Sequence, residues 1–315
     1  MVFARGVDNM KKIYFLLIIL SVCLISVSCK KNDDTRLKLI GSNFPCYDFL
    51  RAVSKDVEGV DVSMLLPPGV DMHSFEVTPS DIIDIDKSSL FVYIGGESEE
   101  YITDILSDLK KDEKNILKLF DYVTKEKERL KEGMEGEEEE EYDEHIWTSL
   151  SNAIKMVEMV KEKLISIDEK NKEKYIENAN KYIEEIIFLD QNIKDVLNTS
   201  SRKTLIFADR FPLQYFAHEY NLDYYAAFKG CSESTEASSK TISFLIDKIK
   251  ENNVNVIFKL ELSSGNIAST ISKATDSKIL TFNSMHNISK EDFDSEKTYI
   301  TIMKENISNL KEALK

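Results

Sequence analysis

The chain has 315 residues, of which 42% are hydrophobic and 10% aromatic, so it can build hydrophobic cores for two domains of ordinary size. Its formal net charge is −15 and its isoelectric point is near 4.9. This acidity argues against binding to nucleic acid and favours cations or a solvated surface.

The amino terminus has the pattern of an export signal. Two basic residues, Lys11 and Lys12, precede an apolar run over residues 13–27. This run is shorter than the roughly twenty apolar residues that a membrane-spanning helix needs. The residues before Met10 do not fit the start of a signal, so we expect translation to begin at Met10. Residues 1–29 are therefore predicted to be a signal peptide.

Residues 26–29 resemble a bacterial lipobox, in which a small residue precedes a cysteine that receives lipid. Ser26 departs from the pattern, since Leu, Val or Ile is usual at its position. We expect lipidation at Cys29 and a polar tether over residues 30–36, so that lipid would hold the protein on the outer face of the cell membrane. The alternative is a soluble secreted protein that is cut near Cys29.

Strand and helix patterns alternate after the tether, which predicts an α/β fold with mostly parallel sheets. Expected strands in the first part cover residues 37–40, 60–66, 90–94 and 116–118. Expected helices there cover residues 47–57, 79–86 and 101–109. An acidic segment follows, in which nine of the thirteen residues 132–144 are Asp or Glu. We expect a solvated, disordered loop, or a segment that gathers cations weakly.

Two consecutive helices are predicted after the acidic segment. Residues 150–165 are amphipathic, and residues 170–197 have apolar positions at helical spacing with no Gly or Pro. The second helix can therefore run for about 40 Å at about 1.5 Å per residue. Strands are then expected at residues 204–208, 223–228, 256–259 and 279–282, and helices at residues 212–220, 238–252, 265–274 and 296–314.

Two of the four histidines lie in motifs that suit a ligand site. His73 lies on a Pro/Gly-rich turn after the expected strand 60–66, and α/β proteins build their ligand sites at the carboxyl ends of strands. His145 lies in the sequence Asp-Glu-His-Ile-Trp at residues 143–147, beside the only tryptophan. A lone histidine is more often structural, so the two motifs together carry the argument.

These segments resemble the histidine motifs of the zinc- and manganese-binding solute-binding proteins of bacterial ABC transporters. Residues 66–81 are similar to that family's Pro-Pro-Gly-x-Asp-x-His motif and residues 143–147 to its Asp-x-His-x-Trp motif. Further similar segments cover residues 91–97, 209–216 and 221–228, so the resemblance extends over nearly the whole mature chain.

The resemblance implies two α/β lobes with mostly parallel sheets, joined by a long helix that limits their closure. The first lobe would cover residues 37–165, which include the acidic loop 132–144. The linking helix would cover residues 166–200, and the second lobe would cover residues 201–315. The alternative is a single larger domain in which the long helix is buried.

The resemblance also implies that His73 and His145 are metal ligands from the first lobe. Neutral imidazoles with carboxylates suit Zn²⁺, whereas Mn²⁺ tolerates more oxygen ligands. Asp143 or Glu144 would orient His145 by accepting its free ring N–H. Trp147 is expected to pack beneath the loop.

The second lobe departs from the family pattern, because Asp209 and Arg210 stand where members commonly have a histidine after a strand. We predict that Asp209 is a ligand; alternatively it pairs with Arg210 or caps the next helix. Glu261 is the predicted fourth ligand, in preference to Asn283, because Asn is a poor zinc ligand. Two histidines are expected to be exposed, although either is a second choice as ligand: His218 and His286.

Cys46 and Cys231 are the only cysteines expected beyond the signal and anchor. Each follows an expected strand, one in each lobe, and both should face the cleft between the lobes. An exported pair can form a disulfide, which would staple the cleft. Separate buried thiols and soft metal ligands are the alternatives.

A closed ligand set leaves no open position for an activated water, so we expect a binding protein and no enzyme. The implied function is extracytoplasmic capture of zinc, with manganese as the alternative, and its delivery by a monomer to a membrane permease. The acidic segment lacks histidine, which leaves manganese open. A surface adhesin with a structural metal is the second hypothesis, and a metalloenzyme is the third.

Overall fold

The computed structural model describes residues 36–136, 141–232, 234 and 236–315, and for His73 only the backbone. The signal peptide, the lipidation of Cys29 and all but the last residue of the tether therefore lie outside the described residues. Within the described part, no helix is long and apolar enough to cross a membrane.

The first sheet has four parallel strands in the order β2-β1-β3-β4. The strands are β1 (Leu37–Gly41), β2 (Val60–Met64), β3 (Leu90–Tyr93) and β4 (Ile116–Lys118). The helices of this lobe are α2 (Phe44–Val53), α3 (Pro79–Lys87) and α4 (Glu100–Leu109). A capping box of Thr78 and Asp81 fixes the start of α3, which orients the chain that leaves the His73 turn.

The second sheet repeats this arrangement with the order β6-β5-β7-β8, again all parallel. Its strands are β5 (Thr204–Phe211), β6 (Asp223–Lys229), β7 (Val256–Lys259) and β8 (Lys278–Thr281). Its helices are α7 (Gln214–Glu219), α8 (Ser239–Glu251), α9 (Asn266–Thr275) and α10 (Lys290–Asp294). Strand β5 runs three residues beyond its predicted end, and its register against β6 shifts between Phe207 and Arg210.

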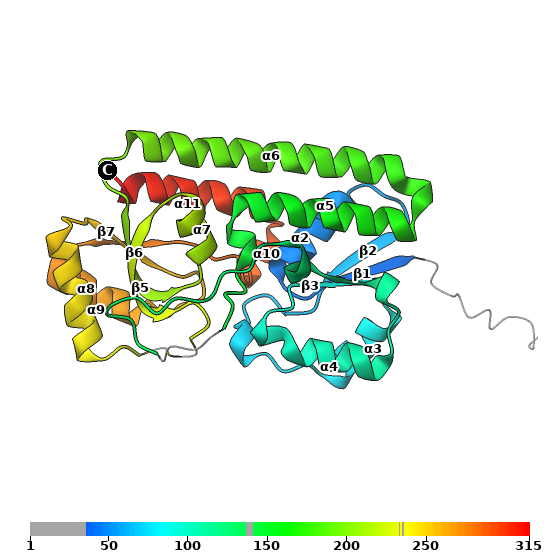
Figure 1. Cartoon of the computed structure of the whole chain (residues 1–315), viewed down its shortest axis with the longest axis horizontal. Helices are drawn as coiled ribbons and strands as arrows, with labels where there is room; N and C mark the ends of the chain where they lie inside the picture. Colours follow the sequence, from blue (N-terminus) through cyan, green and yellow to red (C-terminus); the bar gives the residue numbers. More distant parts are fainter. Residues whose placement is uncertain (1–35, 137–140, 233, 235) are drawn as a thin grey trace, which may run out of the picture. The chain divides into compact units, whose positions relative to one another are not determined.

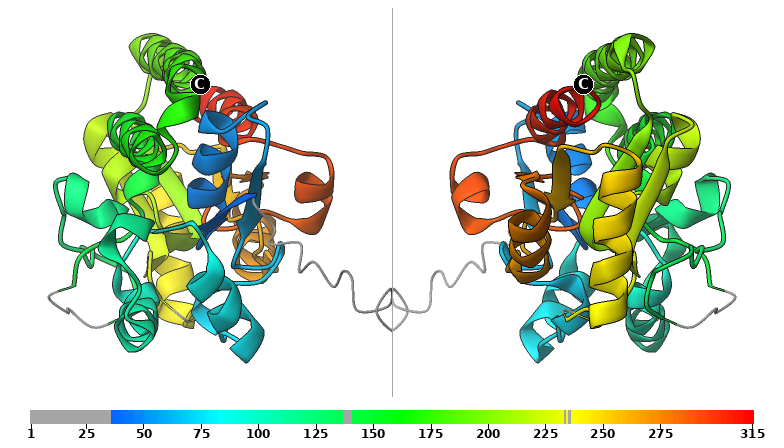
Figure 2. Two further views of the ribbon diagram at one scale, coloured as in Figure 1. Left: turned by 90° about the vertical axis from the view of Figure 1, so that its right-hand side faces the viewer. Right: turned by 90° about the vertical axis from the view of Figure 1, so that its left-hand side faces the viewer.

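Two long helices, α5 (Leu150–Ile167) and α11 (Tyr299–Ala313), pack against a third, α6 (Lys172–Thr199). Helix α6 runs over both sheets, with α11 beside it (Figure 1 and Figure 2). Its buried side chains recur every three or four residues, as in Tyr175, Ala179 and Tyr182. The predicted α/β fold with a long linking helix is therefore confirmed.

One hydrophobic core runs beneath these helices and along the inner faces of both sheets. Smaller clusters fill the outer faces, under α3 and α4 in the first lobe and under α8 and α9 in the second. Because the lobes share the central core, any movement between them must deform a packed interior, which is costly.

The acidic segment is more ordered than the sequence suggested. Lys127 pairs with Tyr142 in an antiparallel bridge, and Glu135 pairs with Phe228 of β6 in a parallel one. The expectation of a disordered loop is therefore wrong for the described residues of this segment. Residues 137–140, which hold four of its acidic side chains, lie outside the described residues.

Candidate metal site

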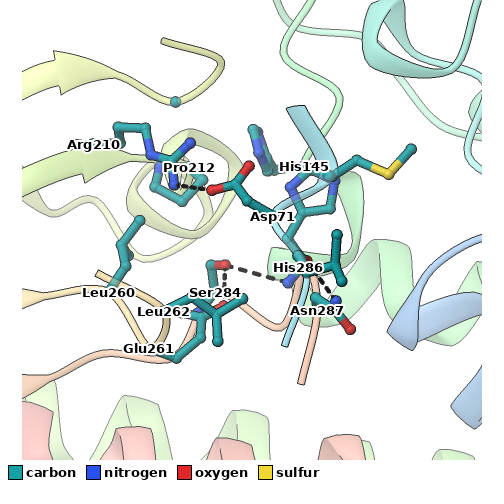
Figure 3. Close-up of a pocket in the computed structure, with 13 residues that line it drawn as sticks. Asp71, His145, Arg210, Pro212, Leu260, Glu261, Leu262, Ser284, His286 and Asn287 are labelled. Carbon is teal, nitrogen blue, oxygen red and sulfur yellow. Dashed lines mark hydrogen bonds and ion pairs between the residues drawn. The ribbon is translucent and has the colours of Figure 1, made fainter. Parts of the chain in front are cut away.

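A pocket lies between the lobes at the carboxyl ends of their strands, where this class of fold places ligands (Figure 3). The first lobe contributes His145 and the turn that includes Asp71. The second lobe contributes Arg210, Glu261 and the loop after β8.

His145 is held in a single orientation by the residue two positions before it. Its Nδ1 lies 2.7 Å from Oδ1 of Asp143, and its backbone N–H donates to the same oxygen at 2.8 Å. Because the carboxylate accepts, Nδ1 carries the proton of the neutral ring, and Nε2 of that neutral ring has a free lone pair. Nε2 is buried and has no hydrogen-bond partner among the described residues. Such an orphan acceptor in a polar pocket is what a metal-ligating histidine presents.

The ionisation of His145 follows from the same contact. Burial by itself lowers the pKa of its ring, but the charge and hydrogen bond of Asp143 outweigh burial, so that the pKa lies above its ordinary value. Asp143 is fixed in turn, since its backbone oxygen accepts from the hydroxyl of Tyr215 at 2.9 Å. The prediction that a neighbouring carboxylate orients His145 is thus confirmed, with Asp143 in that role.

His286, only a second-choice ligand in the sequence analysis, lies at the pocket. The ring of His286 lies nearly perpendicular to that of His145, and the two ring centroids are 5.0 Å apart. The centroids of the His286 and Trp147 rings are also 5.0 Å apart. The indole Nε1 donates to the backbone oxygen of Ser284 at 2.8 Å, which fixes the loop that carries His286. The loop turns inward at Met285, whose φ of 61° is left-handed. The expectation that His286 is exposed is therefore wrong.

Glu144 completes a donor group with the two histidines. One of its carboxylate oxygens and one ring nitrogen each from His145 and His286 lie within 4.8 Å of one another, a spacing that can hold a metal ion. Ser98 binds both oxygens through its N–H and hydroxyl, at 3.0 and 2.6 Å. Burial raises the pKa of Glu144, an effect that nearby His145 opposes. A side chain at Gly96 would collide with Glu144, because an added Cβ would lie 2.3 Å from Cβ of Glu144.

The turn that carries His73 is bound to the loop that carries His286. Gly69 N–H donates to the oxygen of Ile288 at 2.7 Å. The amide of Asn287 donates to the backbone oxygens of Pro67 and Val70 at 2.8 and 2.6 Å. The short 3₁₀ helix Met72–Ser74 follows directly, and its Met72 lines the pocket. His73 thus belongs to a turn at the pocket, while its side chain is outside the described part.

Glu261 and Asp209, the two ligands predicted in the second lobe, are not members of the donor group found among the described residues. Glu261 lines the pocket, but both its oxygens accept from Ser284, at 2.7 and 2.8 Å, and it is not in the group of Glu144 and the two histidines. Asp209 does not line the pocket; its oxygens accept from the backbone N–H groups of Arg210 and Leu260. The guanidinium of Arg210 enters the pocket and pairs with Asp71, while Asp209 contacts the backbone N–H of Arg210.

Among the described residues, the remaining candidates are not members of the donor group, although Cys231 lies beside Glu144. His218 is exposed, as predicted, and its Nδ1 lies 2.5 Å from Oε1 of Glu126. Cys46 and Cys231 are free thiols, so the disulfide considered from the sequence is not formed. Cys46 is packed in the central core, and burial raises the pKa of both thiols.

Comparison with known proteins agrees with this geometry. The family described as zinc-uptake complex component A, periplasmic, matches residues 40–313. The chain belongs to this family. Family membership bears out the resemblance seen in the histidine motifs.

Two curated relatives are each 29% identical to the chain. The high-affinity zinc uptake system protein ZnuA of Bacillus subtilis matches over 95% of this chain and 97% of its own length. The zinc-binding lipoprotein AdcA of Streptococcus pneumoniae matches over 96% of this chain. The chain spans 61% of the length of that relative.

Solved structures share the fold. The lipoprotein YcdH of Bacillus subtilis, described as metal-dependent, superposes with a TM-score of 0.75 at 28% identity, over 89% of this chain and 100% of its own. The Zn(II)-bound ZnuA-like domain of Streptococcus pneumoniae AdcA gives 0.73 at 26% identity, over 89% of this chain and 99% of its own.

Proposed function

We propose that this member of the zinc-uptake component family captures Zn²⁺ between its lobes outside the cytoplasm and hands it to a membrane permease. The observation that carries the proposal is the buried Nε2 of His145, which has no hydrogen-bond partner among the described residues and lies with His286 and Glu144 in one donor group. A buried polar nitrogen that no hydrogen bond satisfies costs stability unless a ligand uses it.

The proposed ligands are His73, His145, His286 and one oxygen of Glu144. Three imidazoles and a carboxylate form the closed four-ligand set that zinc prefers, whereas Mn²⁺ is better served by more oxygen. Glu144 can bind Ser98 and a metal together, because each carboxylate oxygen has two lone pairs. A closed set offers no position for an activated water, which supports transport and not catalysis.

The names of the relatives support the partner and the location. Relatives named as zinc-uptake and zinc-binding lipoproteins support a permease partner and an extracytoplasmic place for this chain. We propose that lipid on Cys29 supplies the membrane attachment and that the protein acts as a monomer. Mass spectrometry of the protein from membranes would detect the lipid on Cys29, and an unmodified amino-terminal peptide would contradict the anchor.

The test is zinc affinity by competition with a chromophoric chelator. The wild type should hold one ion per chain, and His145→Ala and His286→Ala should each weaken binding by about a hundredfold or more. His218→Ala is the matched control, since this histidine is exposed and lies outside the donor group. Tight binding that survives both His145→Ala and His286→Ala would overturn the site.

Glu144→Gln and Glu261→Gln decide between the two candidate carboxylates. The proposal expects a large loss for Glu144→Gln and a small one for Glu261→Gln, whose oxygens are already engaged by Ser284. A larger loss for Glu261→Gln would return the fourth ligand to the residue expected from the sequence.

Surface adhesion is the second candidate function. The laminin-binding protein Lmb of Streptococcus agalactiae, described as bifunctional with adhesin and metal-transporting activity, has a TM-score of 0.73 at 25% identity, over 89% of this chain and 100% of its own. Binding of this protein to immobilised laminin would support an adhesive role. Absence of binding with both the zinc-loaded and the metal-free protein would contradict it.

A further inference from the structure

The pocket contains a cation that cannot ligate a metal. The guanidinium of Arg210 enters from strand β5 of the second lobe, and its Nη2 lies 2.8 Å from Oδ2 of Asp71 on the His73 turn of the first lobe (Figure 3). Guanidinium has no free lone pair at any accessible pH, so this position supplies no metal ligand.

Local structure explains why Arg210 points into the pocket. The register of β5 against β6 takes one extra residue between Phe207 and Arg210, which is a β-bulge, and bulges redirect side chains. Asp209 accepts the N–H of Arg210 at 2.9 Å and that of Leu260 at 3.1 Å, which holds the bulged backbone. Nη1 of Arg210 also reaches the backbone oxygen of Ser232 at 3.4 Å.

Among the described residues, the ion pair is one attachment of the His73 turn to the second lobe. Another is the set of hydrogen bonds from Gly69 and Asn287, which holds residues 67–70. Asp71 stands between this set and His73, two residues before the histidine. The ion pair therefore lies two residues before the proposed ligand and ties this part of the turn to strand β5.

We propose that Arg210 is a positioning residue that holds the His73 turn closed over the metal through Asp71. The proposal rests on the proposed function, because it concerns the same metal. The charges of Arg210 and Asp71 act on a bound cation with opposite signs, so their direct effects largely cancel. The main effect of the ion pair is therefore to restrain the movement of the His73 turn. This restraint should slow the dissociation of zinc.

The test is a double-mutant cycle of Arg210→Gln and Asp71→Asn, measured by chelator competition and by the rate at which a chelator removes zinc. Each single variant should lose about tenfold in affinity, mainly through faster dissociation. The double variant should be no weaker than the weaker single variant, because the contact can be lost only once. Arg210→Lys should restore part of the loss by keeping the charge.

Lys131→Gln is the matched control. Lys131 forms an ion pair with Asp223 that is more exposed than that of Arg210 and lies outside the residues that line the pocket. This variant should leave affinity and dissociation unchanged, and the metal-free variants should melt with the wild type, which would exclude general unfolding.

Two outcomes overturn the inference. Tighter zinc binding by Arg210→Gln would mean that the guanidinium only repels the ion. Additive losses in the double variant, with Asp71→Asn much the larger, would mean that Asp71 is itself a ligand. Failure of the proposed function is distinguishable, because then the wild type would bind no zinc or would bind it equally well after His145→Ala.

Discussion

Asp143 and His145 form the contact that prepares the site: Oδ1 of the carboxylate and Nδ1 of the ring are 2.7 Å apart, and both side chains are almost fully buried. The carboxylate fixes the tautomer, so that Nε2 faces the pocket as an acceptor. We predict that Asp143→Ala weakens zinc binding by about tenfold to a hundredfold. Chelator competition measures this loss, with Asp121→Ala, an exposed aspartate outside the donor group, as control. Unchanged affinity in Asp143→Ala would show that the ring needs no partner.

The same pair predicts how zinc binding depends on pH. Zinc and a proton compete for Nε2, and Asp143 raises the pKa of His145 even though burial opposes it. Affinity should therefore fall as the pH drops through this raised pKa, at a higher pH than an ordinary histidine would require. In Asp143→Ala the carboxylate of Asp143 no longer raises the pKa of His145, so the zinc affinity should begin to fall at a lower pH. Chelator titrations from about pH 8 to about pH 5 measure the shift. Identical pH profiles for the two proteins would contradict this assignment.

Much of the fold could be predicted because its signals are local. Buried parallel strands such as β3 are short apolar runs, and the apolar spacing of residues 170–197 marks a long helix. His145 could be predicted for the same reason, since Asp143, the histidine and Trp147 lie within five residues. The ring, its orienting carboxylate and its packing partner come from one segment.

Glu261 was predicted and lines the pocket, but the places of Arg210 and His286 could not be predicted, because they depend on backbone irregularities. The bulge in β5 puts Arg210 into the pocket and leaves Asp209 bonded to backbone, which reverses the choice made from sequence position alone. His286 depends on a left-handed turn at Met285, a conformation that no sequence pattern requires of methionine. The one available signal was its place after the last strand, the same argument that selected His73.

Glu99 gives a prediction about stability. Burial raises its pKa from 4.5 to about 7; one oxygen accepts from Gly95 N–H at 2.7 Å, and the other has no hydrogen-bond partner among the described residues. The folded protein therefore binds a proton that the unfolded chain has released, and stability falls as the pH rises from about 4.5 to about 7. The integrated loss is about 3 kcal/mol. Glu99→Gln should remove this dependence and stabilise the metal-free protein above pH 7.

Urea unfolding at a pH on each side of this range provides the measurement. The exposed neighbour Glu97 supplies the control, since Glu97→Gln should leave the pH dependence unchanged. A midpoint for the wild type that does not fall between the two pH values would contradict the raised pKa of Glu99.

Asp48 connects helix α2 of the first lobe to the long helices α6 and α11. Its buried carboxylate, on α2, accepts hydrogen bonds from the hydroxyl of Tyr182 on α6, from the N–H of Tyr299 at the start of α11 at 2.9 Å, and from Arg51 at 2.5 Å. Asp48→Ala would leave these donors unpaired, one of them charged, in the central core. We expect a loss of about 3 to 5 kcal/mol in the free energy of unfolding.

Because the two lobes share this core, both should still unfold in a single transition, measured by urea titration followed by circular dichroism. Asp195→Ala, at an exposed position on α6, should change stability by less than about 0.5 kcal/mol. Two separate transitions in Asp48→Ala would instead mean that the lobes fold independently and that α6 is only a connector.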